Sequence, residues 1–270
     1  MTLELSGPKL RLAFEGLVAR SEEQGGVEAY VDALKLKSAL FRDLLQDLDP
    51  KGLRTLCAHM PTVRRRIGRH AEATSFDAMR ARIETLLAGR EDAAGADRRV
   101  AAFCAGFPED RDHRWVRDLA AELLHNLDPE RYPLMQRWVW DARTNTGVIR
   151  EIWHGEDVDV IRIDVPDGYA TFLALREELA GYLTQNGVFR DVLWYVDVLT
   201  AHVYADYIGE RGGTYLRTDF ATPEDPMLHT RRILGLDGVD AATGRTRLKA
   251  ADGVADIADI ADNANMAAGR

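Results

Sequence analysis

The chain has 270 residues and a formal net charge of −9, and apolar residues make up 46% of it. This composition is ordinary for a globular protein and too apolar for a disordered one. The excess of acidic groups argues against non-specific binding to nucleic acid or to an anionic membrane surface.

The sequence contains no apolar run near the roughly 18 residues that span a bilayer, and its first residues lack a basic patch followed by an apolar stretch. Cys57 and Cys104 stand far apart in apolar surroundings, a usage typical of free thiols in a reducing compartment. We therefore expect a cytoplasmic protein without a membrane segment.

Helical periodicity dominates the chain. Apolar residues recur at intervals of three and four, which places them on one face of an α-helix, within residues 27–45, 76–87, 116–127 and 189–207. Residues 169–183 are expected to form the antiparallel partner of the last of these helices, with Asn186-Gly187 as the turn. The predicted fold class is mainly α, a multi-helix bundle.

One segment departs from this pattern. Val158–Val165 is rich in β-branched residues and nearly alternates apolar and polar ones, which favours a strand. It would pair with residues near Val148–Trp153, so a small β-hairpin is predicted within 148–165. The spacing of Val148 and Ile152 fits a helix as well, and that alternative stays open.

Composition shifts divide the chain into three parts. Residues 89–97 are small and polar, which is typical of a linker, and after residue 236 the chain becomes rich in Ala, Asp and Gly. We expect an N-terminal helical domain over 1–90, a C-terminal helical domain over 98–236, and an acidic, mobile tail over 237–270.

Charge is also unevenly distributed. Residues 51–90 carry nine Lys and Arg against three Asp and Glu, whereas residues 151–270 carry eleven against twenty-one. Arg65, Arg66 and Arg69 line up at three and four within the basic stretch. A solvated helix face, a docking surface for an acidic protein and a nucleic-acid contact are the three interpretations of this patch.

A second binding candidate is the Trp- and Arg-rich segment between residues 131 and 154. Trp and Arg are the residue types that dominate binding energy at protein interfaces. The partner-binding candidates in this segment are Arg137, Trp138, Trp140 and Arg143. The alternative is a core helix followed by a polar turn at 141–147.

A Glu-x-x-His spacing occurs twice, as Glu122–His125 and Glu151–His154. On a helix this spacing places a carboxylate and an imidazole on one face, as in dimetal helical bundles. Both histidines fall nearly opposite the apolar stripes of their segments, which predicts that the side chains point outward unless a second layer covers them, and this weakens the metal hypothesis.

The remaining catalytic candidates lie on the late helix. His202 and Asp206 stand four residues apart, with Tyr195 on the same flank. A carboxylate at this spacing can orient an imidazole and raise its basicity, as a general base requires, or the two can form a simple surface ion pair.

No phosphate-binding loop, nucleophile elbow or zinc motif is present in the sequence, and no cofactor is indicated. We therefore expect an accessory or adaptor protein that binds an acidic protein partner, rather than an enzyme. The alternatives are a helical-bundle enzyme, metal-dependent or using the His202/Asp206 pair, and a nucleic-acid-binding protein.

Overall fold

The computed structural model describes residues 2–155, 158, 160–212 and 227–238. Within these residues the chain is helical and forms no strand, only the isolated bridges Leu5–Trp153 and Asp141–Thr146. The prediction of a mainly α, multi-helix bundle is confirmed. The predicted acidic tail lies, from residue 239 onward, outside the described residues.

The α-helices differ widely in length, and short 3₁₀ turns join several of them. The α-helices are α1 (Gly7–Ser21), α2 (Gly26–Leu44), α3 (Pro50–Ala58), α4 (Ala73–Leu87), α5 (Ala96–Cys104), α6 (Trp115–Leu127), α7 (Val148–Glu151), α8 (Tyr169–Gln185), α9 (Val192–Gly212) and α10 (Leu228–Ile233). The 3₁₀ turns are η1 (Glu22–Gln24), η2 (Ile67–Ala71), η3 (Ala93–Gly95), η4 (Arg111–His113) and η5 (Leu236–Gly238).

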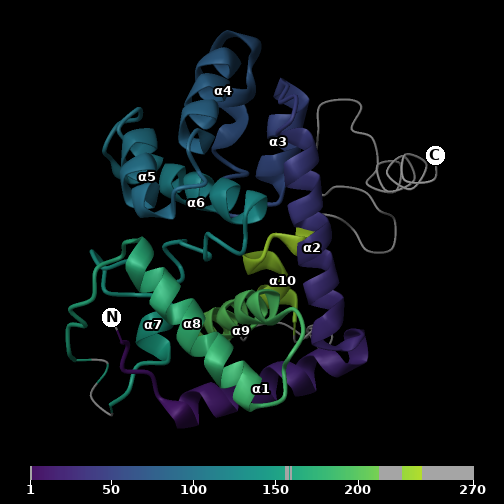
Figure 1. Ribbon diagram of the computed structural model, residues 1–270, viewed down its shortest axis with the longest axis vertical. Helices are drawn as coiled ribbons and strands as arrows, with labels where there is room; N and C mark the ends of the chain where they lie inside the picture. Colours follow the sequence, from purple (N-terminus) through teal and green to yellow (C-terminus); the bar gives the residue numbers. More distant parts are fainter. Residues whose placement is uncertain (1, 156–157, 159, 213–226, 239–270) are drawn as a thin grey trace.

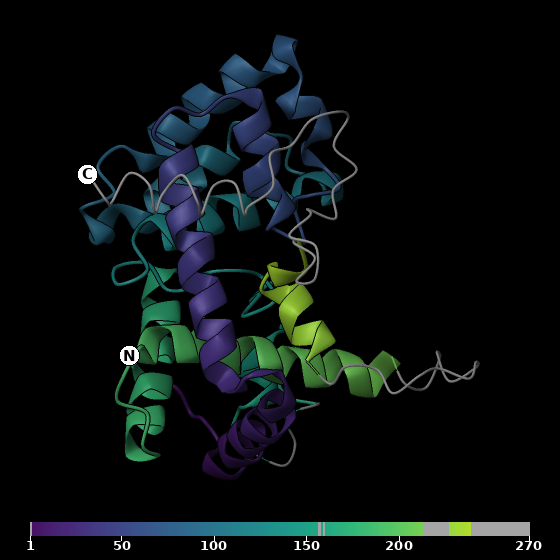
Figure 2. The same ribbon diagram turned by 90° about the vertical axis from the view of Figure 1, so that its right-hand side faces the viewer.

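The helices form two halves joined along α2 (Figures 1 and 2). One half, here called the α3–α6 half, holds α3, α4, α5 and α6. The other half holds α1, α7, α8 and α9, and α10 lies between the halves. The long helix α2 runs past both of them and packs against α6 of one half and α9 of the other.

Helix α9 is the axis of the second half. It contacts α1, α2, α7, α8 and α10, so most of its circumference is buried, including polar side chains. The turn at Asn186-Gly187 joins α8 to α9 as predicted. The expected antiparallel pairing of α8 and α9 is wrong, because the two helices cross at a steep angle in Figure 2. Helix α9 packs against several helices rather than against α8 alone.

The β-hairpin considered for residues 148–165 does not form in its described part. Val148–Glu151 is the short helix α7 and residues 160–165 are irregular. The backbone amides of Val148 and Ile149 donate to carbonyls of residues 138 and 139, and Gly147 permits this close approach since a Cβ there would lie 2.7 Å from the Val139 oxygen. The backbone that a second strand would need is therefore already paired.

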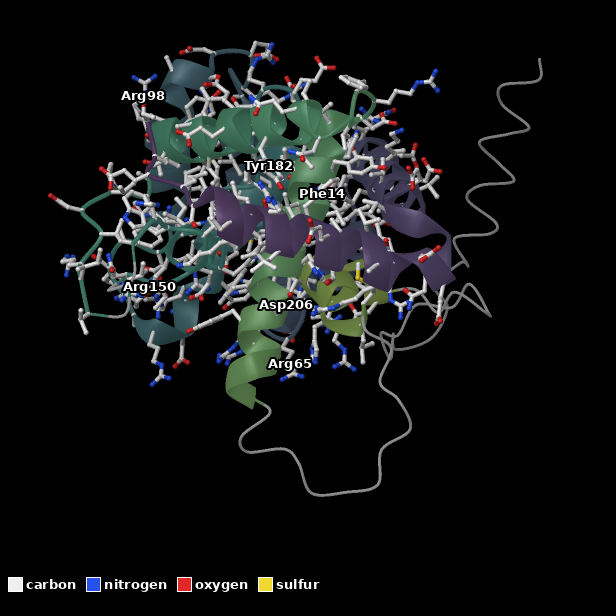
Figure 3. All side chains as sticks on the ribbon, turned by 90° about the horizontal axis from the view of Figure 1, so that it is seen from below. Phe14, Arg65, Arg98, Arg150, Tyr182 and Asp206 are labelled. Carbon is white, nitrogen blue, oxygen red and sulfur yellow. The ribbon has the colours of Figure 1, made fainter. Side chains whose placement is uncertain are left out.

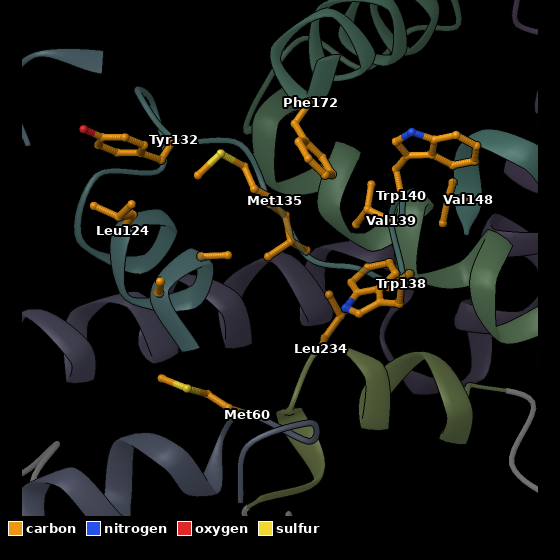
Figure 4. Packing of buried hydrophobic residues seen from close by; sticks show 14 of the residues in the cluster. Met60, Leu124, Tyr132, Met135, Trp138, Val139, Trp140, Val148, Phe172 and Leu234 are labelled. Atoms are coloured by element: carbon orange, nitrogen blue, oxygen red, sulfur yellow. The ribbon is translucent and has the colours of Figure 1, made fainter. Parts of the chain in front are cut away.

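The apolar core is continuous from one half to the other. Figure 4 shows Trp140 beside Val148, with Phe172 of α8 and Met135 close by. The predicted boundary near residues 89–97 separates α4 from α5, which pack against each other. The division into domains at that point stays a prediction.

Two smaller sequence expectations concern the thiols and the membrane. Cys57 and Cys104 are both free, the first buried and the second half-buried, and burial raises the pKa of each thiol. Among the described helices, none combines the length and the apolar character that crossing a bilayer requires.

The loop after α10 gives a direct test of the packing between the halves. Gly235 has a φ of 72°, and a Cβ there would lie 1.8 Å from the carbonyl oxygen of His59, at the end of α3. We expect Gly235→Ala to lower the free energy of unfolding by about 2–4 kcal/mol, since it adds backbone strain and a clash.

Gly181 of α8 is the matched control, because a Cβ there meets nothing within 4 Å. Gly181→Ala is expected to raise stability by about 0.5–1 kcal/mol through helix propensity. Urea denaturation of both variants measures the two changes, and equal effects would contradict the described position of the loop.

Candidate functional site

Four charged side chains meet in the interior where α2, α6 and α9 converge: Lys37, Glu122, His125 and Asp197, here called the buried charge cluster. The Lys37 ammonium lies 3.0 Å from Glu122 Oε2 and donates to the Leu234 carbonyl at 2.9 Å. The carboxylate of Glu122 also accepts from the side-chain amides of Asn126 and Gln136. Each charge in this pair is therefore both neutralised and hydrogen-bonded, as burial demands.

His125 forms the second pair of the cluster. Its Nδ1 lies 2.8 Å from the Tyr132 carbonyl oxygen and its Nε2 lies 3.1 Å from Asp197 Oδ2. Both partners can only accept, so both ring nitrogens donate and the imidazole is cationic. Burial by itself opposes this charge, but the Asp197 carboxylate and the two hydrogen bonds outweigh it and raise the pKa of His125.

The expectation that Glu122 and His125 face solvent is wrong: their side chains are 2% and 6% exposed. The apolar stripe of α6 covers only part of the helix, but α9 and the segment 132–140 cover the opposite side as well. A helix that is buried all round gives its polar residues no water, so they pair with one another.

The arrangement of the cluster does not suit catalysis. The cavity beside it has a volume of about 10 Å³, room for at most about one water molecule. His125 has no free nitrogen with which to accept a proton from a substrate. The cluster is a structural charge network.

The second Glu-x-x-His pair does not complete a metal site with the first. Glu151 lies at the end of α7 and His154 follows it, exposed, with its backbone amide bound to the Glu4 carbonyl. In the part of the chain that the structure describes, no three His, Cys, Asp or Glu side chains are grouped to hold a metal ion.

The structure brings His202 and Asp206 together and places Tyr195 in a different contact. His202 is fully buried, and its Nε2 lies 3.6 Å from Asp206 Oδ2 and forms no hydrogen bond. Burial, with some help from the charge of Arg20, lowers the pKa of His202 to about 4 although Asp206 opposes the shift. The Tyr195 hydroxyl donates to Glu28 at 2.6 Å, and this pair joins α9 to α2.

The Trp- and Arg-rich segment contributes mainly to the core. Trp138 and Trp140 are buried, and the Trp140 indole donates to the Val165 carbonyl at 2.9 Å. The Arg137 guanidinium binds the buried carboxylate of Asp118, with Nη2 at 2.6 Å. Of the four partner-binding candidates in this segment, Arg143 alone is exposed.

The basic stretch around residues 64–69 forms a turn followed by the 3₁₀ turn η2, not an α-helix. Arg65 and Arg69 are exposed and have no ion pair within the described residues, whereas Arg66 reaches Asp112 at 3.3 Å. Arg65, Arg66 and Arg69 are here called the arginine turn. They lie on the surface, as the docking hypothesis requires.

A larger arginine-lined feature lies between α4 and α5, in a groove of about 390 Å³. Its lining contains Arg82 from α4 and Arg98 and Arg99 from α5, and no carboxylate. None of the three arginines forms an ion pair inside the described parts of the chain, and the carboxylate closest to Arg98 and Arg99 at Gly95 is that of Asp92. Arg82 lies over the Phe107 ring at 5.0 Å and Arg99 lies over the Tyr132 ring at 5.9 Å. We call this feature the α4–α5 groove.

The pKa of His70 is affected by arginines of both the arginine turn and the α4–α5 groove. Burial lowers the pKa of this half-buried imidazole, and the positive charges of His113, Arg69 and Arg82 lower it further. Arg69 of the arginine turn and Arg82 of the α4–α5 groove therefore both act on His70, and Asp110 and Asp112 lie beside it in the same hollow. Figure 3 shows Arg98 at the upper left of the molecule and Arg65 at its lower edge, so the arginine turn and the α4–α5 groove are separate features.

Comparison with known proteins returned no match, whether to a protein-family model, to a curated protein or to a solved structure.

The Lys37–Glu122 pair can be tested by a double-mutant cycle. Glu122→Gln leaves the Lys37 ammonium buried without a counter-charge and is expected to cost about 3–5 kcal/mol of unfolding free energy. Adding Lys37→Met removes that charge, so the double variant should lose clearly less than the sum of the single losses. Urea denaturation measures each value, and simple additivity would contradict a direct pair.

The raised pKa of His125 predicts a pH dependence of stability. The folded state holds this proton more tightly than the unfolded chain, so the stabilisation is complete below about pH 6.5 and is lost as pH rises through the folded pKa. The destabilisation caused by His125→Gln should therefore be larger at pH 6 than at pH 9. Exposed His154→Gln is the control, and a pH-independent effect of His125→Gln would contradict a cationic His125.

Proposed function

We propose that the protein is an accessory protein that binds an acidic protein partner through the arginines of its α3–α6 half. The observation that carries this proposal is the α4–α5 groove, where three guanidinium groups gather and no carboxylate lines the site. Arginines in such a position keep their charge available to a partner, and Arg is enriched at the energetically dominant positions of interfaces.

The state of the buried histidines and the net charge of the protein support a protein partner over a catalytic role. The interior acid–base groups are either saturated with partners, as His125 is, or enclosed, as His202 is. The exposed arginines instead lie on a protein with a net charge of −9. The acidic surface of the rest of the protein repels a long polyanion such as nucleic acid. An acidic protein that contacts only the arginine-bearing half avoids this repulsion.

The test combines partner identification with charge reversal. Affinity purification of the full chain from its native host, followed by mass spectrometry, is expected to recover an acidic protein that elutes at raised ionic strength. The triple variant Arg65→Glu, Arg69→Glu and Arg98→Glu should weaken binding of the purified partner by at least about tenfold at an unchanged melting temperature.

A matched control changes the same number of charges elsewhere. Arg11, Arg42 and Arg190 are exposed and lie on α1, on α2 and before α9. Reversing these three to Glu should leave the affinity within about twofold, because none of them lines the α4–α5 groove or belongs to the arginine turn. Equal losses in the two triple variants, or retained binding in the first, would refute the proposal.

Arg143→Glu alone tests whether the Trp- and Arg-rich segment contributes a contact.

A further inference from the structure

We infer that the α4–α5 groove binds an amphipathic α-helix of the partner that carries acidic residues along the edges of its apolar face. This inference rests on the proposed function and specifies the site and the form of the ligand. It stands on the lining pattern of the groove, on the way its arginines are held, and on two glycines that make room for them.

The lining residues have a regular pattern on both helices. Helix α4 contributes Ala81, Arg82, Thr85 and Leu86, and helix α5 contributes Arg98, Arg99, Ala102 and Phe103. Both sets follow the spacing i, i+1, i+4 and i+5, so each helix presents one continuous face to the groove. Two adjacent helix faces of this kind form the trough into which a third helix packs, as in helix-in-groove recognition.

The floor and the rim of the groove have different chemistry. Leu86 and Phe103 form the apolar base, and the small, exposed side chains of Ala81 and Ala102 let another backbone approach closely. Arg82 and Arg99 line the same groove and are half-buried, and Arg98 lines it and is exposed. A helix with an apolar face between acidic edges matches both parts at once, whereas a compact anion such as phosphate would leave the apolar floor uncovered.

Two of the three guanidinium groups are held in place without losing their charge. Arg82 rests on the face of Phe107 and Arg99 on the face of Tyr132, and Arg99 also donates to the Asp92 carbonyl at 2.7 Å. Contacts with ring faces and with neutral oxygens fix a guanidinium plane while its remaining N–H groups can bind a carboxylate. The Nε atom of Arg99 is buried and has no hydrogen-bond partner within the described structure.

Two glycines give these arginines their positions. A Cβ at Gly106 would lie 1.5 Å from Arg82 Nη1, and a Cβ at Gly95 would lie 2.7 Å from Arg99 Nη1. An alanine at either position would therefore displace a guanidinium without changing the net charge. This allows the location of the charge to be tested separately from its presence.

The probe is a fluorescein-labelled 16-residue peptide with Leu at intervals of three and four and Glu on both sides of that stripe. Fluorescence anisotropy with the full-length protein should show binding that weakens as salt is raised. A matched peptide with Gln in place of every Glu should bind at least about tenfold more weakly. Sodium decanoate, an amphiphile with one carboxylate, is the competitor that represents a small-molecule ligand.

Three variants locate the site. Arg82→Gln with Arg98→Gln should weaken peptide binding by about tenfold or more, and the charge-neutral Gly106→Ala should weaken it several-fold, with helix content and melting temperature close to wild type. Arg65→Glu with Arg69→Glu should leave peptide binding unchanged, since the arginine turn lies outside the groove.

The inference is overturned if the groove variants bind the peptide as wild type does, if the Gln peptide binds equally well, or if decanoate binds as tightly as the peptide. Each of these outcomes leaves the proposed function standing when capture of the native acidic partner still depends on Arg65, Arg69 and Arg98. The reverse result, groove-dependent peptide binding with no acidic native partner, supports the groove and refutes the proposed function.

Discussion

The buried Lys37–Glu122 ion pair is the interaction on which the arrangement of the helices depends most. An ammonium and a carboxylate lose their hydration in the interior, so each must find full compensation from groups on other helices. Here α2 supplies the cation, α6 supplies the anion, and the loop after α10 supplies the Leu234 carbonyl. Any shift of α2 along α6 would separate the two charges.

The His125–Asp197 pair extends the same constraint from α6 to α9. Apolar packing alone tolerates several nearly equivalent placements of one helix on another, whereas two ion pairs at fixed points allow only one. The three central helices are thus held in one relative position. The shorter helices of both halves pack around this frame and leave the arginines of α4 and α5 at its periphery.

The sequence predicted the helices well because their apolar spacing is a local property. It did not predict the interior of α6, because the partners of Glu122 lie 85 residues away on α2 and 14 residues away in an irregular segment. One local signal was present: Lys37 falls within the apolar stripe that includes Leu34 and Phe41. A lysine at such a position indicates a buried partner of opposite charge.

The α4–α5 groove was harder to anticipate for a different reason. Its Arg98 and Arg99 follow a small, polar stretch that resembles a linker, and only the packing of α5 on α4 brings them to Arg82. The three arginines are separated by too many residues for a helical repeat to join them. The arginine turn was visible in the sequence because its members lie within five residues of one another, and the exposure of all three agrees with the solvated face considered there.

The contacts of the loop after α10 can form only late in the synthesis of the chain. Lys37 lies 197 residues before Leu234, so during translation α2 and α6 emerge long before the carbonyl that satisfies this lysine. Arg64 and Asp237 are similarly distant, at 173 residues. Until α10 and Leu234 leave the ribosome, the Lys37 ammonium lacks one of its hydrogen-bond partners and the junction between the halves stays open to water. The molecule therefore completes its fold only after nearly the whole of its described sequence has been synthesised.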